Sequence, residues 1–193
     1  DMAVTENGAI AFARDGSRIE RIDALTPEAR AARRQRLATI AAQLAQAFPE
    51  VPATDDNEAR ISDVAFDFAE HVDIAESVRR AMHAEAQRLG ARTFESSIHF
   101  HATLDFDDKA SGTVRALHQR FGCDVSEARV RYAFVGDSGN DEACFSAFRH
   151  TFAVSNIAPY LPRLSVGPQY LAAGAASVGF AQVAAALLQA QDR

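Results

Sequence analysis

The segment Phe134 to Asp141, with the sequence FVGDSGND, concentrates the residues best suited to chemistry. An apolar strand here runs into a glycine and an acidic residue, and ligands bind at this end of the strands in open α/β sheets. If the loop curls back, Asp137 and Asp141 converge on one hard cation. Mg²⁺ typically takes one or two protein carboxylates, together with water and phosphate oxygens. The segment therefore predicts a magnesium site in which Asn140 holds a water ligand or a phosphate oxygen.

A lone upstream lysine, Lys109, precedes Asp137 by 28 residues (137 − 109) and begins a predicted helix. A phosphoryl-transfer site needs positive charge beyond its metal, and a compact ammonium group supplies it. Most lysines are simply exposed, just as many acidic turns only cap a helix. The order lysine, helix, apolar strand and GDSGND favours the functional interpretation of both features.

The elements around this loop alternate between helix and strand. Strands that alternate with helices and read as continuous apolar runs are typical of a parallel sheet. The expected elements are a helix over 110–121, a strand over 132–135, a helix from the loop to 148, a strand over 151–154 and a helix over 180–189.

The first hundred residues follow a different order. Short apolar runs and Gly-containing turns predict strands over 2–5 and 9–13. Amphipathic spacing and period-two alternation then predict helix, strand, helix and strand over 26–48, 64–68, 74–89 and 98–103. This order predicts an α+β layer with helices over one face of a sheet.

Taken together, these motifs resemble the haloacid dehalogenase (HAD) superfamily, specifically its Cof-type or subfamily IIB phosphatases. GDSGND resembles the fourth motif of the family and Asp108–Gly112 the third. The matching secondary segments are Glu6–Ala9 (ENGA), Val154–Asn156 (VSN) and Gly179–Phe180. The resemblance implies an α/β, Rossmann-like core with an inserted α+β cap. Residues 1–7 would be a core segment, 8–105 the cap and 106–193 the C-terminal part of the core.

The resemblance also implies an activity, that of a Mg²⁺-dependent phosphatase acting on a small phosphorylated metabolite such as a sugar phosphate. Asp137 and Asp141 would ligate Mg²⁺, Lys109 would neutralise the phosphate, and Asn140 would help to orient these groups. Reaction through an aspartyl-phosphate splits one difficult step into two. A phosphosugar mutase, or a non-catalytic remnant that binds metal or a partner, remains an alternative.

The family's nucleophile belongs to a DxDxT motif that lies upstream of the ENGA turn, and this sequence contains no such segment before Glu6. Asp105–Asp108 contains DxD, but it follows the cap and is interpreted as a hinge. We therefore expect the chain alone to be inactive. We also expect its partner to be a missing N-terminal core segment, or a chain that supplies it, beside the apolar edge of strand 132–135.

Five further residues are candidates for substrate contact: Glu6, Asn7, Arg60, His99 and His101. Each could instead have no role in substrate binding. Glu6 and Asn7 could simply form the turn, and exposed arginines and histidines are common on protein surfaces. The spacing of His99 and His101 alone lacks the remaining ligands of a metal site.

Composition narrows the functional classes. A formal charge of −6 and a pI near 5.5 argue against nucleic-acid or membrane-surface binding, which need a basic face. Cys123 and Cys144 lie far apart, so they predict neither a disulfide framework nor a zinc site. With no membrane span or signal-peptide pattern apparent, the expected compartment is the cytoplasm.

Overall fold

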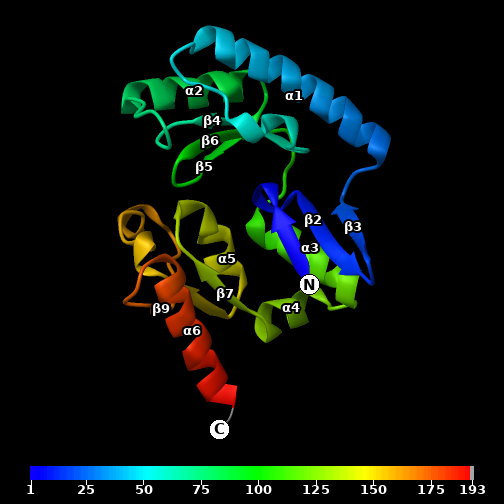
Figure 1. The fold of residues 1–193 in the computed structure, drawn as a ribbon, viewed down its shortest axis with the longest axis vertical. Helices are drawn as coiled ribbons and strands as arrows, with labels where there is room; N and C mark the ends of the chain where they lie inside the picture. The colour runs from blue at the N-terminus through cyan, green and yellow to red at the C-terminus, as the bar shows by residue number, and fades with distance from the viewer. Residues whose placement is uncertain (192–193) are drawn as a thin grey trace. The chain divides into compact units, whose positions relative to one another are not determined.

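The computed structural model describes residues 1–191 and divides into two compact units, residues 1–108 and 109–193 (Figure 1). The first unit holds two antiparallel sheets and the second a parallel one. The mixed α/β class predicted from the sequence is confirmed.

The chain opens with the sheet β1-β2-β3, made of β1 (Met2–Thr5), β2 (Ile10–Asp15) and β3 (Arg18–Asp23). Strands β1 and β2 were predicted, whereas β3 was missed because its residues are mainly charged and exposed. The expected start of the cap at residue 8 falls inside this sheet, between two strands that pair with each other.

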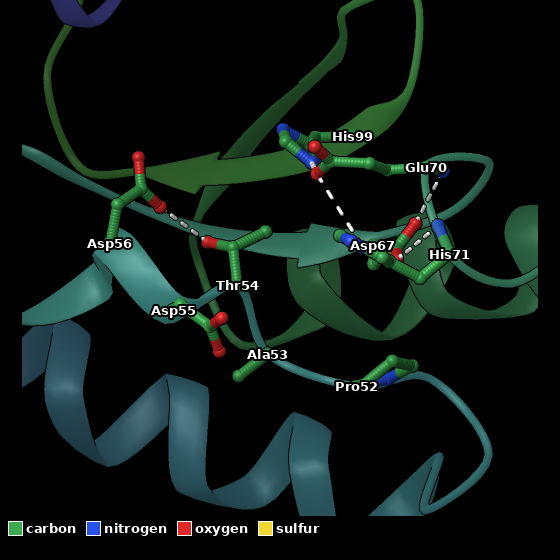
Figure 2. A pocket seen from close by; sticks show the side chains of 9 residues that line it. All are labelled: Pro52, Ala53, Thr54, Asp55, Asp56, Asp67, Glu70, His71 and His99. Atoms are coloured by element: carbon green, nitrogen blue, oxygen red, sulfur yellow. Dashed lines mark hydrogen bonds and ion pairs between the residues drawn. The ribbon is translucent and has the colours of Figure 1, made fainter.

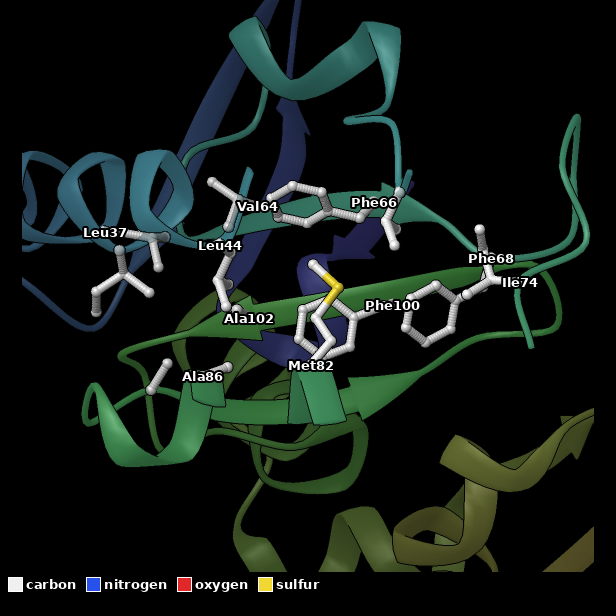
Figure 3. Close-up of a cluster of buried hydrophobic side chains, with 13 residues drawn as sticks. Leu37, Leu44, Val64, Phe66, Phe68, Ile74, Met82, Ala86, Phe100 and Ala102 are labelled. Atoms are coloured by element: carbon white, nitrogen blue, oxygen red, sulfur yellow. The ribbon is translucent and has the colours of Figure 1, made fainter. Parts of the chain in front are cut away.

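The second sheet has the order β4-β6-β5, with β4 (Asp63–Asp67), β5 (Arg92–Glu95) and β6 (His99–Thr103). Helices α1 (Pro27–Ala47) and α2 (Glu76–Arg88) cover one face (Figure 1). Alternation directs apolar side chains of β4 and β6 toward these helices. Figure 3 shows the resulting core, which includes Leu37, Leu44, Val64, Phe66, Phe68, Met82 and Phe100. The predicted layer with helices over one sheet face is confirmed.

Polar residues occupy the alternate positions of the same strands. Asp63 pairs in register with Thr103, and Asp67 pairs with His99. Asp63, Asp67, His101 and Thr103 are all buried. Buried polar groups require partners, so this polar side of the sheet carries a network of hydrogen bonds and ion pairs.

The second unit contains the parallel sheet β7-β8-β9, formed by β7 (Ala133–Gly136), β8 (His150–Ala153) and β9 (Tyr170–Leu171). The expected strands at 132–135 and 151–154 correspond to β7 and β8. The helices of this unit are α3 (Lys109–Phe121), α4 (Val125–Arg131), α5 (Glu142–Ala147) and α6 (Ala176–Gln191).

Helix α6 begins earlier than the predicted residue 180. Asn156 Oδ1 accepts a hydrogen bond from the Ala176 backbone N–H at 2.8 Å, and the Ser155 N–H donates to Gly174 O. The VSN segment thus satisfies a backbone donor at the start of α6, a local contact that helical periodicity does not reveal.

Within residues 1–191, the structure contains no helix with the length and apolar character that crossing a membrane requires.

Candidate active site

The loop after β7 is organised around one buried carboxylate. Asp141 is 2% exposed, and its Oδ2 accepts hydrogen bonds from the backbone N–H groups of Asp137 (2.7 Å) and Ser138 (3.0 Å). Ser138 and Asp141 also form a capping box. The predicted curl of the GDSGND loop is therefore present, and Asp141 holds it in place.

Gly136 makes this curl sterically feasible. A Cβ at this position would lie 2.7 Å from Asp141 Oδ2 and 2.8 Å from Phe145 Cζ. Non-bonded carbon atoms pack at about 3.5–4.0 Å, so a larger residue would displace the carboxylate. The glycine before the first aspartate is thus required by close packing against the second.

Lys109 meets the loop from the start of α3. Its Nζ lies 2.6 Å from Asp141 Oδ1 and 2.9 Å from Asn140 Oδ1. The lysine side chain is 31% exposed, so it is partly accessible to solvent while its ammonium group pairs with the buried Asp141. It is also the only lysine in the sequence, the other 19 of the 20 basic residues being arginines (20 − 1). The structure thus brings three predicted site residues, Lys109, Asn140 and Asp141, together.

Asp137 behaves differently from Asp141. It is exposed, and no residue that the structure describes forms a hydrogen bond or ion pair with its carboxylate, since only its backbone N–H is engaged. The loop therefore carries an uncommitted carboxylate, that of Asp137, in addition to the oxygens that Lys109 holds. Mg²⁺ prefers such hard oxygen donors, so the donor set fits this ion.

Ser138 contributes to the loop rather than to nucleophilic chemistry. Its side chain is buried, and its Oγ donates to Asn140 Oδ1 at 2.8 Å. Among the described residues, no histidine is bonded to it, so the arrangement lacks the base that activates a serine.

Glu6 lies far from this loop in the chain and has a structural role in the first unit. Its carboxylate accepts hydrogen bonds from the N–H of Ile61 (2.9 Å), the Oγ of Ser62 (2.7 Å) and the N–H groups of Ser62 and Asp63. Asn7 adopts a left-handed φ of 53°, and its buried Oδ1 has no partner among the described residues. Glu6 therefore stabilises the fold through these hydrogen bonds. Of the two residues, Asn7 is the one whose side-chain acceptor is unused.

Arg60 is neutralised within the first unit. It donates to Asp56 at 2.8 Å and to Asp63 at 3.1 Å. Burial alone would lower the pKa of Arg60, but these two carboxylates raise it overall. Because its guanidinium already has two anionic partners, Arg60 offers less charge to a substrate anion than its sequence position suggested.

The two candidate histidines have different surroundings. His101 is buried, with Nδ1 2.9 Å from Asp63 Oδ2 and its ring stacked on Phe94. His99 Nε2 lies 2.6 Å from Glu70 Oε2. His99 and Glu70 line a cavity of about 470 Å³ (Figure 2). Of these two histidines, His99 lines this cavity and His101 does not. Sequence reasoning missed the other polar residues of this cavity, because they lie on separate segments.

Asp105, the first residue of the DxD segment, has a structural role in the first unit. Its carboxylate forms ion pairs with Arg30 and Arg33 and is 3% exposed. A carboxylate held by two guanidinium groups in this way stabilises the fold of the first unit.

No protein-family model matches the sequence, and no curated protein matches it. Solved structures do share its architecture. Sucrose-phosphatase from Synechocystis, solved with sucrose and phosphate, is 16% identical with a TM-score of 0.63, over 93% of this chain and 70% of that one. The fold is that of HAD-superfamily phosphatases.

Two further structures agree with this assignment. A HAD subclass IIB sugar phosphatase is 14% identical with a TM-score of 0.58, over 89% of this chain and 70% of that one. A Thermoplasma acidophilum protein is 19% identical with a TM-score of 0.62, over 92% of this chain and 68% of that one. The HAD fold thus covers most of the chain and includes the α+β cap predicted from the sequence.

Proposed function

We propose that this protein is a Mg²⁺-dependent phosphatase of a small phosphorylated metabolite, most simply a sugar phosphate, and that it acts in the cytoplasm. One observation carries the proposal. In the loop after β7, a buried aspartate lies 2.6 Å from the only lysine of the chain, and the same loop carries the exposed and uncommitted carboxylate of Asp137. A cation and a free carboxylate so placed suit the binding of a metal-bound phosphate group.

Each residue has a separate task in this proposal. Asp141 holds the Lys109 ammonium in position, and the ammonium neutralises phosphoryl oxygens as charge develops on them. Asn140 Oδ1, bonded to both Lys109 and Ser138, keeps the loop closed around that ammonium. Asp137 would hold Mg²⁺. Asp141, whose two oxygens already accept hydrogen bonds, would hold the ion through water, or directly in exchange for one of these bonds. The metal would supply further positive charge at the phosphate.

The reaction proceeds through an aspartyl-phosphate. An aspartate oxygen attacks phosphorus, the bond from phosphorus to the sugar oxygen breaks, and the released oxygen takes a proton. Water then attacks phosphorus, the aspartyl bond breaks and inorganic phosphate leaves. The nucleophile is not one of these 193 residues, and a core segment beside β7 would supply it. Among the described strands, β7 pairs only with β8, which supports a free edge at this place.

The choice of a sugar phosphate rests on the structural neighbours. They include the sucrose-phosphatase above and a protein related to trehalose-6-phosphate phosphatase, the latter 15% identical with a TM-score of 0.57. The cytoplasmic location is supported by two free, buried cysteines, Cys123 and Cys144, since cytosolic proteins keep their thiols reduced.

The single lysine permits a direct chemical test. Reductive methylation modifies amines, so within this sequence only Lys109 and the chain's amino terminus can react. We expect Mg²⁺ with inorganic phosphate to slow methylation of Lys109 severalfold. We also expect the Lys109→Met variant of the full natural-length protein to lose Mg²⁺-dependent hydrolysis of sucrose 6-phosphate or trehalose 6-phosphate.

The matched control for this test is Arg131→Met, which removes an exposed cation of the same unit. This variant should hydrolyse the substrate at the wild-type rate. Wild-type activity in Lys109→Met would contradict the proposal. So would an absence of Mg²⁺-dependent hydrolysis in the wild-type protein, because it would favour a non-catalytic role.

A further inference from the structure

We propose that the first unit contains a zinc site formed by Asp67, Glu70, His71 and His99. All four residues line the cavity of about 470 Å³ (Figure 2). Each residue can offer one ligand atom, giving two carboxylate oxygens and two imidazole nitrogens. This donor set belongs wholly to residues 1–108 and does not depend on the proposed phosphatase activity.

The distances between the donor atoms fit a single ion. Asp67 Oδ2 lies 3.2 Å from His71 Nδ1, which in turn lies 3.8 Å from Glu70 Oε2. With metal–donor distances of about 2.0–2.2 Å, the donors of a tetrahedral zinc site lie about 3.3–3.6 Å apart. The ligand atoms of Asp67, Glu70 and His71 all lie within 4.8 Å of one another. His99 lies outside this group of three, but its Nε2 is 2.6 Å from Glu70 Oε2. To complete the site, His99 would exchange its hydrogen bond with Glu70 for a bond to the ion.

The local fold positions these donors before any ion binds. Asp67 ends β4, and its carboxylate accepts hydrogen bonds from the N–H groups of Glu70 (2.7 Å) and His71 (2.8 Å). This turn brings three donors together within five residues of chain. The pairing of β4 with β6 then sets His99 directly opposite Asp67. Support of this kind orients ligands and strengthens metal binding.

The charge of the cavity favours a cation. Its nine lining residues include Asp55, Asp56, Asp67 and Glu70 but no lysine or arginine. A divalent ion would offset this concentration of negative charge.

The ligand types select zinc over magnesium. Imidazole and carboxylate together suit Zn²⁺, whereas Mg²⁺ favours oxygen donors alone. The His71 side chain is 77% exposed and that of Glu70 is 43% exposed, which gives an ion access from solvent. Because the His71 side chain is so exposed, it can be replaced with little loss of packing.

The experiment is a titration of the metal-free chain with Zn²⁺ by isothermal calorimetry. We expect one ion to bind per chain, and we expect His71→Ala and His99→Ala each to weaken binding at least tenfold. Co²⁺ used in place of Zn²⁺ should give the visible absorption of a tetrahedral site, and His99→Ala should abolish that spectrum. Circular dichroism reports whether each variant folds, and Glu70→Gln provides a further variant at a partly exposed position.

His83→Ala is the matched control. His83 also pairs with a glutamate, Glu95, at 2.7 Å, but it lies outside the cavity. This variant should bind Zn²⁺ as the wild type does, and so should Asp137→Asn, which separates this site from the proposed magnesium site. The proposal is overturned if the wild type does not bind Zn²⁺, or if folded His71→Ala and His99→Ala variants bind it with unchanged affinity.

Discussion

Charged residues of the first unit and those of the loop after β7 are used in different ways. In residues 1–108, Glu6, Arg30, Arg60 and Asp105 have their charged groups engaged by partners within the same unit. In the loop, Asp141 is engaged in the same way, but the exposed Asp137 has no side-chain partner among the described residues. The engaged charges stabilise the fold, whereas the carboxylate of Asp137 is available to a ligand.

The largest loss of stability is expected when Arg30, a buried cation, is replaced. It is 6% exposed and forms ion pairs with Asp23 and Asp105. Removing one partner of a buried pair leaves an uncompensated charge and costs about 3–5 kcal/mol. We expect Arg30→Met to lower the free energy of unfolding by that amount in urea denaturation.

The matched control for Arg30 is Arg80→Met, because the Arg80–Glu76 pair is about 70% exposed on both sides. Exposed pairs contribute about 0–1 kcal/mol. If the two variants were equally stable, the buried ion pairs would not be what holds this part of the fold.

A smaller effect is expected at Glu6. Glutamine keeps the shape of the side chain but turns one acceptor into a donor that faces the backbone N–H groups of residues 61–63. An unsatisfied buried group costs about 1–3 kcal/mol. Urea denaturation of Glu6→Gln should show this loss, whereas Glu50→Gln at an exposed position should leave stability unchanged. Equal stability of these variants would restore Glu6 as a candidate for substrate contact.

Gly136→Ala tests the packing that holds Asp141. The added Cβ would meet the Asp141 side chain, and overpacking of this kind costs about 1–3 kcal/mol. Because the carboxylate must move, we expect hydrolysis to fall as well. Gly167→Ala is the control, since its Cβ would meet no atom closer than 4.0 Å. Full activity in Gly136→Ala would show that the close contact is dispensable.

The smallest effect is a pH dependence at Asp23. Burial would raise its pKa, but hydrogen bonds from Arg30 and the Leu25 N–H lower it below the usual value of about 3.9. The unfolded state therefore binds the proton more readily. The stabilisation is complete above about pH 4 and is lost as the pH falls through the folded-state pKa. We expect the unfolding free energy of Asp23→Asn to fall less steeply than that of the wild type below pH 4, and parallel curves would contradict this account.

Periodicity was sufficient to predict the long elements of this molecule. Helix α1 and strands β4 and β6 have clear spacing of apolar residues, so they were predicted nearly to their ends. Strand β3 has a charged sequence and helix α4 has only 7 residues, so neither gives a comparable signal. The spacing of apolar residues therefore predicts an element only where that element is long enough to bury an apolar face.

The candidate site was only partly accessible from the sequence. The motif order predicted that Lys109, Asn140 and Asp141 belong together, and the structure places them within hydrogen-bonding distance. The use of Glu6 by backbone donors 55 residues or more away could not be predicted, because it depends on how the turn and strand β4 meet. In the cluster of Asp67, Glu70, His71 and His99, the first three are local in sequence, and only the position of His99 depends on the pairing of β4 with β6.

The most direct test of the central claim is Mg²⁺-dependent phosphate release by the Asp137→Asn variant of the full natural-length protein. We expect a loss of roughly a thousandfold or more, because a metal ligand contributes several kcal/mol of charge stabilisation. We also expect an unchanged free energy of unfolding, since Asp137 has no structural partner to lose. Asp124→Asn, an equal change at an exposed helix cap, should retain wild-type turnover. Near-normal turnover in Asp137→Asn would contradict the account.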